Sequence, residues 1–115
     1  PLACTAALAV LDIMEEENLL DRVTVQSKPW HAALEALARK HPSVVKGLRG
    51  RGYHLALVID GDPLAWVGRF RENGLLTVRG GSDAIRLMPP LTVSAQDLDT
   101  SVEIIDFVIG THDQK

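Results

Sequence analysis

The chain has 115 residues, a length that allows one domain with a modest hydrophobic core. Hydrophobic residues make up 46% of the sequence and charged residues 23%, which excludes an intrinsically disordered chain. The 12 basic and 15 acidic side chains leave no surplus of positive charge for a phosphate backbone or an anionic membrane. We therefore expect neither nucleic-acid nor membrane binding.

The opening segment, residues 1–11, contains no charged side chain. It is too short to cross a bilayer and lacks the basic start of a secretory signal. It also has no polar face at helical spacing, so we expect another part of the protein, or a partner, to cover it. Its Cys4 is the only cysteine of the chain, which fits a cytoplasmic location; with no cation nearby, this thiol is predicted to be buried and inert.

The first part of the chain predicts two helices. Strong helix formers over residues 2–20 indicate a long helix, whereas the β-branched residues within 21–26 leave that stretch ambiguous. Pro29 would interrupt a continuous helix. A second helix is therefore expected to begin with Ser27 as its N-cap and to end at the His41-Pro42 pair.

The middle of the chain predicts a strand followed by a helix. The glycine-rich segment 47–52 is interpreted as a flexible or bulged approach to a strand over residues 53–59, which is apolar on both faces. Asp62 as N-cap and Gly74 beyond the last turn bracket the next helix. Its buried stripe is expected to consist of Leu64, Val67 and Phe70.

The last part predicts a hairpin and a helix. Residues 75–78 and 84–88 read as two short apolar strands joined by a five-residue loop. The final helix is expected to begin at Ser94, with Asp97 in a capping position, and to stop at Gly110. This order of elements predicts an α+β fold, in which a small three-stranded, mainly antiparallel sheet is packed with helices in one domain over residues 1–115.

The sequence contains no established catalytic motif. Its glycine-rich runs lack the strand-then-helix context of phosphate-binding loops. The histidines are scattered, so we predict no metal site. RNA binding through segment 47–52 and Tyr53 is disfavoured, because the chain is acidic and only 4% aromatic. The four histidines are His31, His41, His54 and His112.

Arg86 stands in an otherwise apolar strand. Alternation along the strand points it to the face opposite Ile85 and Leu87, alongside Ala84 and Met88. A guanidinium among apolar neighbours is typically retained because it binds a carboxylate or phosphate through two parallel hydrogen bonds. That anion belongs either to the same chain, as a structural ion pair, or to a ligand, and the pattern alone leaves both alternatives open.

Three segments of the sequence are distinctive: PLACTAALAVLDIMEEENLLDRV, RGRGYHLALVI and ENGLLTVRGGSDAIRLMPPLTVSAQDLDTSVEIIDFVI. Together they cover most of the chain. In this order they resemble the C-terminal part of class III (ornithine-type) pyridoxal-phosphate aminotransferases, and most closely that of the acetylornithine aminotransferases. The family usually continues a helix through residues 24–30, and Pro29 predicts a departure from it at that point.

The resemblance implies that the chain is a fragment of a larger enzyme. Residues 1–20 would form the helix between the large cofactor domain and the small C-terminal domain, and residues 27–110 the body of the small domain. The Schiff-base lysine of such enzymes lies upstream of PLAC. We therefore expect no catalytic residue, no cofactor-binding residue and no bound pyridoxal phosphate in this chain alone. Its own lysines stand in a different context: Lys28, Lys40, Lys46 and Lys115.

One functional residue carries over from the resemblance. Arg86 matches the family's arginine that binds the substrate α-carboxylate. The parent enzyme would transfer an amino group from N2-acetylornithine, or a related ornithine-type amine, to 2-oxoglutarate in arginine biosynthesis. Its expected partners are its own N-terminal pyridoxal-phosphate domain, a homodimer partner, and the amino-acid and 2-oxo-acid substrates. The alternative is a free-standing, non-catalytic α+β interaction domain derived from such an enzyme.

Overall fold

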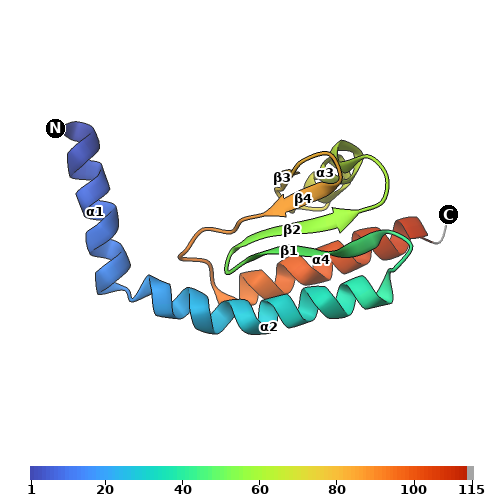
Figure 1. Cartoon of the computed structure of the whole chain (residues 1–115), viewed down its shortest axis with the longest axis horizontal. Helices are drawn as coiled ribbons and strands as arrows, with labels where there is room; N and C mark the ends of the chain where they lie inside the picture. The colour runs from blue at the N-terminus through green and yellow to red at the C-terminus, as the bar shows by residue number, and fades with distance from the viewer. Residues whose placement is uncertain (114–115) are drawn as a thin grey trace.

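The computed structural model describes residues 1–113 and has the α+β fold that the sequence predicted (Figure 1). The helices of the described residues are α1 (Leu2–Glu16), α2 (Leu19–Lys40), α3 (Pro63–Glu72) and α4 (Ala95–Asp113). The strands are β1 (Val45–Arg51), β2 (His54–Ile59), β3 (Val78–Arg79) and β4 (Ala84–Leu87).

Within residues 1–113 the sheet has four antiparallel strands in the order β1-β2-β4-β3, not the three that were predicted. The additional strand is β1. Its glycines hid it, because glycine is depleted in strands. Gly50 is required by space, since a Cβ there would lie 2.1 Å from the carbonyl oxygen of His54. At the other edge, β3 has only two residues, so the strand predicted over residues 75–78 is largely wrong.

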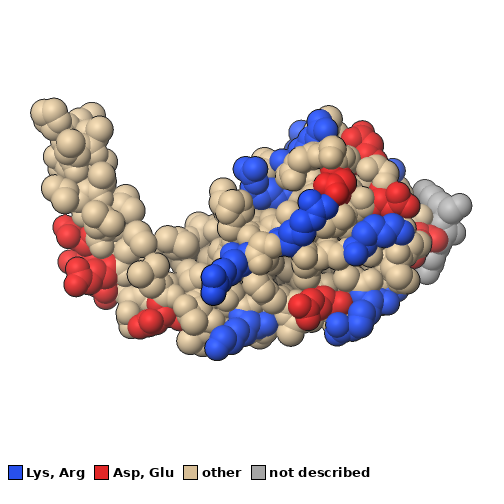
Figure 2. All heavy atoms as spheres, in the orientation of Figure 1, with Lys and Arg blue, Asp and Glu red and all other residues tan. Residues whose placement is uncertain are grey.

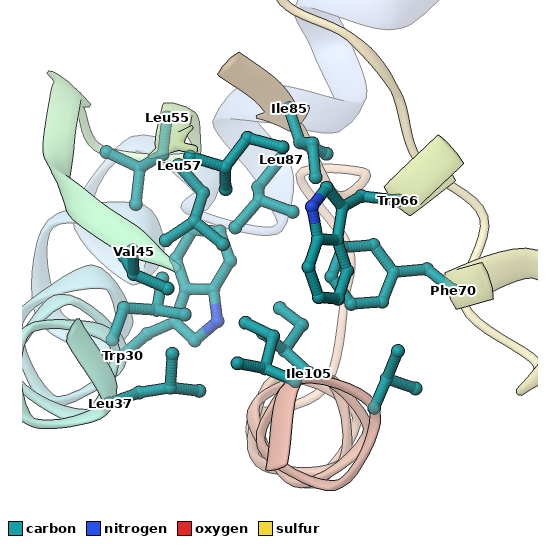
Figure 3. Close-up of a cluster of buried hydrophobic side chains, with 14 of the residues drawn as sticks. Trp30, Leu37, Val45, Leu55, Leu57, Trp66, Phe70, Ile85, Leu87 and Ile105 are labelled. Carbon is teal, nitrogen blue, oxygen red and sulfur yellow. The ribbon is translucent and has the colours of Figure 1, made fainter. Parts of the chain in front are cut away.

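The hydrophobic core lies on one face of the sheet, between the strands and helices α2, α3 and α4 (Figure 3). Alternate residues of the strands point into it, as the two-residue period of a strand requires. Strand β2 contributes Leu55, Leu57 and Ile59, while Ala56 and Val58 on its other face are only half-buried. The helices add Trp30, Leu34, Leu37, Trp66, Phe70, Leu98, Ile105, Val108 and Ile109.

The boundaries of the first two helices differ from the prediction. Helix α1 ends at Glu16, and Asn18 adopts a left-handed conformation with φ 53° before α2 begins. Asparagine is one of the few residues that tolerate this conformation. Helix α2 then runs through Pro29, so the predicted break and the start at Ser27 are wrong, as is the predicted departure from the family pattern.

Packing explains why Pro29 does not end α2. An internal proline costs about 3 kcal/mol, because it removes one backbone hydrogen bond and its ring crowds the preceding turn. The ring lies on the exposed side of the helix. The opposite side is buried against the rest of the domain, and burial of each large apolar side chain stabilises by about 1.5–3 kcal/mol. The buried residues of α2 are Leu19, Ser27, Trp30, Leu34 and Leu37.

Of the predicted N-terminal caps, Asp62 and Ser94 are confirmed, whereas Ser27 lies inside α2. The Asp62 carboxylate accepts a hydrogen bond from the backbone N–H of Leu64 at 3.0 Å, at the start of α3. The Ser94 hydroxyl accepts one from the N–H of Asp97, also at 3.0 Å, at the start of α4. These polar caps satisfy backbone groups that the helices themselves leave free.

The buried side of α3 and the end of α4 need correction. Leu64 is exposed, and Trp66 joins Phe70 in the core instead, with Val67 half-buried. Helix α4 continues past Gly110 to Asp113, because Val108 and Ile109 anchor its last turns in the core.

Helix α1 stands away from the rest of the molecule and contains no buried residue (Figure 1). Cys4 is therefore exposed, and the prediction of a buried thiol is wrong for the chain by itself. Figure 2 shows the surface of α1 as uncharged, apart from acidic side chains near its C-terminal end. None of the helices in residues 1–113 is long and apolar enough to cross a membrane.

Candidate functional site

The face of the sheet opposite the core holds an open pocket of about 400 Å³. Strands β1, β2 and β4 form its floor, and the turn before β4 borders it. Ala56 of β2 lies at the centre, because it pairs with Arg49 of β1 on one side and with Arg86 of β4 on the other. Paired residues of neighbouring strands point to the same face, so both guanidinium groups belong to this surface. Arg51, His54, Gly50 and Gly80 also line the pocket.

Arg86 points to the outer face, as strand alternation predicted. Its neighbours Ile85 and Leu87 are buried in the core. Ala84, predicted to share the face of Arg86, is fully buried, whereas Met88 is exposed beyond the end of β4. No hydrogen bond or ion pair joins the Arg86 side chain to another residue in the described range, 1–113. Of the two alternatives left by the sequence, the structural ion pair is therefore not formed here.

Gly80 brings the turn before β4 close to Arg86. A Cβ on Gly80 would lie 3.0 Å from the backbone nitrogen of Arg86 and 3.4 Å from its Cβ. The N–H of Gly80 donates a hydrogen bond of 2.8 Å to the carbonyl of Ala84, which closes the hairpin. Glycine thus allows this close approach of the turn to Arg86, beside the pocket that both residues line.

Arg49 is a site residue that the sequence analysis missed, together with Arg51 and His54. The alternation of side chains along a strand could have identified them. It was not applied, because segment 47–52 was interpreted as an approach to a strand and not as a strand itself. The guanidinium of Arg49 forms an ion pair with the carboxylate of Asp83, in the turn before β4. The two side chains are 58% and 48% exposed, so the pair contributes at most about 1 kcal/mol to stability.

A second polar cluster joins the C-terminal end of α2 to α4. The buried ring of His41 lies with Nε2 2.6 Å from Oδ1 of Asp106, and Lys40 donates a hydrogen bond of 2.7 Å to Oδ2 of the same carboxylate. Hydrogen bonds from Lys40 and then from His41 hold the pKa of Asp106 below its ordinary value of 3.8. None of these residues lines the outer-face pocket, so we assign the cluster to the scaffold.

Tyr53 is not available for stacking on a base, which removes the RNA-binding interpretation of segment 47–52. The residue is only 4% exposed, and its hydroxyl donates a hydrogen bond of 2.9 Å to Oε1 of Gln26. Burial raises the pKa of Tyr53, and the nearby charge of Arg22 partly offsets this.

The described residues do not by themselves fit a pyridoxal-phosphate site. Such a site needs a lysine amine beside the pocket. Lys40 instead binds Asp106, and Lys46 donates hydrogen bonds to the carbonyls of Pro42 and Ser43. Lys28 does not line the pocket, and Lys115 lies outside the described residues. Within residues 1–113, no group of three or more His, Cys, Asp or Glu side chains could hold a metal ion.

Comparison with known proteins decides the family. The profile of the family described as aminotransferase class III matches residues 1–109. The chain belongs to the class III aminotransferases. It is 38% identical over 111 residues to an acetylornithine aminotransferase of Gloeobacter violaceus, covering 96% of this chain and 28% of that protein. It is also 33% identical over 109 residues to an ornithine aminotransferase of Bacillus subtilis, covering 95% of this chain and 26% of that one.

Solved structures of class III aminotransferases share the fold. The acetylornithine aminotransferase of Elizabethkingia anophelis superposes with a TM-score of 0.86 and 33% identity, over 95% of this chain and 28% of that one. The ornithine δ-aminotransferase of Plasmodium falciparum gives 0.93 and 26%, over 100% of this chain and 30% of that one. The chain thus spans less than a third of the length of these relatives.

Proposed function

We propose that this chain is the C-terminal small domain of a pyridoxal-phosphate-dependent aminotransferase. The parent enzyme transfers an amino group from N2-acetylornithine, or a related ornithine-type amine, to 2-oxoglutarate in arginine biosynthesis. The observation that carries the proposal is the guanidinium of Arg86, which lines an open pocket and has no partner in residues 1–113, in a chain of this family. The choice of amine follows the acetylornithine and ornithine aminotransferases among its relatives.

Arg86 binds the α-carboxylate of the substrate in this proposal. A guanidinium donates two parallel hydrogen bonds to a carboxylate, and these fix the orientation of the amino acid as well as its position. Orientation matters because the bond broken at Cα must stand nearly perpendicular to the cofactor ring. Pyridoxal phosphate, held by the remainder of the parent enzyme, supplies the electron sink that stabilises the resulting carbanion.

The exposed apolar surface of the chain supports contact with other parts of the parent enzyme. Helix α1 buries none of its residues, although Leu2, Leu8 and Leu11 are apolar and more than half exposed. A free-standing interaction domain would leave this surface in water, which argues against that alternative. We assign α1 to the inter-domain helix, packed against the N-terminal cofactor domain of a cytoplasmic homodimer. Residues 1–20 and 27–110 are then the helix and the body of one small domain.

A second exposed apolar surface also supports contact with another part of the parent enzyme. Leu76 is 82% exposed and Met88 61%, and both border a groove of about 260 Å³ between segment 75–77, the chain after β4 and helices α2 and α4. The buried hydroxyl of Thr77 in this groove has no hydrogen-bond partner among the described residues. A covering domain would bury the apolar side chains and could satisfy this hydroxyl.

Replacing Arg86 in the full-length enzyme tests the proposal. For Arg86→Ala, we expect kcat/KM with both N2-acetylornithine and 2-oxoglutarate to fall at least about 100-fold, because two charge-assisted hydrogen bonds are lost. Arg86→Lys should retain part of the activity, since a single charge remains. Arg71→Ala on the exposed side of α3 is the matched control. Unchanged kcat/KM for both substrates in Arg86→Ala would exclude the carboxylate-binding role.

A further inference from the structure

The outer-face pocket carries more than one guanidinium that could reach a carboxylate. Arg49 and Arg86 flank the same residue, Ala56, from the two neighbouring strands. Neighbouring strands lie about 4.8 Å apart, so the two arginine backbones are about 10 Å apart across the strand between them. An arginine side chain is long enough to cover half of that distance. A carboxylate held by Arg86 above the small side chain of Ala56 is therefore within reach of Arg49 as well.

Only one of these two guanidinium groups is bound within the described chain. Asp83 forms an ion pair with Arg49, whereas Arg86 has no partner in residues 1–113. Asp83 is well placed for this task. Its backbone carbonyl accepts a hydrogen bond of 2.9 Å from the N–H of Ile59, which fixes the turn against β2. From this turn, the side chain of Asp83 reaches the guanidinium of Arg49 on β1.

We infer that Asp83 is a positioning residue for the substrate carboxylate: by binding Arg49, it holds the second guanidinium away from the site where Arg86 acts. The inference rests on the proposed role of Arg86. A free Arg49 would offer the carboxylate a second binding mode, in which the Cα–H bond no longer has the orientation that the reaction needs. Asp83 thus selects one orientation by removing the competing one.

Arg51 serves as an internal comparison. It also lines the pocket, but it pairs with His54, two residue pairs closer to the β1–β2 turn, and not with Ala56. Residues two positions apart on a strand lie about 6.8 Å apart. Arg51 is therefore farther than Arg49 from the position above Ala56, and the inference applies to Arg49 alone.

The two possible roles of Asp83 have different kinetic signatures. A binding mode that does not react removes enzyme from the productive complex. It lowers the maximal rate and the apparent dissociation constant by the same factor, and their ratio stays constant. A merely structural role would instead misplace Arg86 and lower that ratio.

The experiment measures single-turnover half-reactions of the full-length holoenzyme with L-glutamate and with N2-acetylornithine, followed through the absorbance of the bound cofactor. For Asp83→Asn, we expect the maximal rate and the apparent dissociation constant both to fall at least about threefold, with their ratio unchanged. Adding Arg49→Met to Asp83→Asn should restore both values to within about twofold of the wild type. Adding Arg51→Met should not restore them.

Asp60→Asn is the matched control, because Asp60 is also a turn aspartate facing a cation of β1, Lys46, at 3.8 Å, and neither residue lines the pocket. It should leave both values unchanged. The inference is overturned if Asp83→Asn changes neither value, or if it lowers their ratio and Arg49→Met does not restore it. The proposed function fails separately, if Arg86→Ala leaves the kinetics with both substrates unchanged.

Discussion

The two faces of the sheet are built for different purposes. Toward the helices, strands β2 and β4 present large apolar side chains that are at most 5% exposed, such as Leu57 and Ile85. On the other face the same strands present Ala56 and Arg86, and β1 adds Arg49. Adjacent residues of one strand therefore meet a close-packed core on one side and an open, positively charged pocket on the other.

This difference shows where stability and binding reside in the domain. Burial of apolar area stabilises the inner face, where a lost methylene group leaves a cavity. The outer face contributes little to stability, because the ion pair between Arg49 and Asp83 is exposed to solvent. Substitutions at neighbouring positions of β2 should therefore separate stability from activity.

Leu57→Ala should cause the largest loss of stability among our predictions. Leu57 is fully buried, so its truncation removes apolar contacts and leaves a cavity that costs about 2–5 kcal/mol. Hydrogen exchange of the β2 and β4 amides in the full-length enzyme measures this as a lower free energy of local opening. Unchanged protection of these amides would show that the inner face does not stabilise the sheet.

Ala56→Leu, one position earlier, should lower activity and leave stability nearly unchanged. The larger side chain would occupy the floor of the pocket between Arg49 and Arg86, where we place the substrate carboxylate. We expect kcat/KM to fall about 10–100-fold, a cost of about 1.4–2.7 kcal/mol in the transition state. Protection of the β2 amides should change by less than about 0.5 kcal/mol, as for most surface substitutions.

Ala56→Ser is the control for this change, because it alters polarity while leaving the pocket open. It should retain most of the activity. If Ala56→Leu reacts with normal kinetics, the carboxylate does not bind above Ala56, and the outer-face pocket is not the substrate site.

The fold could be predicted from the sequence where local signals agreed. Short, mainly apolar runs identified the strands that became β2 and β4, and Asp62 and Ser94 identified two helix starts. The failures came from long-range packing. Glycines concealed β1, which is stable because it pairs with β2, and Pro29 suggested a break that burial of the opposite side of α2 overrides.

The site could be predicted only in part, for the same reason. Arg86 was identifiable because a charged residue in an apolar strand breaks the local pattern. Arg49 and Asp83 gave no such signal: 34 positions separate them in sequence, and only the order of the strands brings them together. Ala56 gave no signal in the sequence either, because its role is to leave open space in the pocket between Arg49 and Arg86.

The smallest effect we predict concerns the scaffold cluster that joins α2 to α4. The folded-state pKa of Asp106 lies below its ordinary value of 3.8, mainly because Lys40 and His41 hydrogen-bond the ionised carboxylate. This contribution is therefore fully present above pH 3.8 and is lost as the pH falls through the lower folded-state pKa. Because the Asp106 side chain is 35% exposed, solvent screening limits the contribution to about 1 kcal/mol.

Asp106→Asn should accordingly lower the free energy of local opening of α2 and α4 by up to about 1 kcal/mol at pH 7, as measured by hydrogen exchange in the full-length enzyme. The difference in free energy between Asp106→Asn and the wild type should shrink as the pH falls below 3.8 and through the lower folded-state pKa. The wild-type carboxyl group is then protonated and, like the asparagine amide, carries no charge. Asp99→Asn on the exposed side of α4 is the control and should show no such pH dependence. A difference that is equal at pH 7 and below the folded-state pKa would mean that the cluster acts through shape and not through charge. That result would leave burial of apolar area as the main link between the two helices.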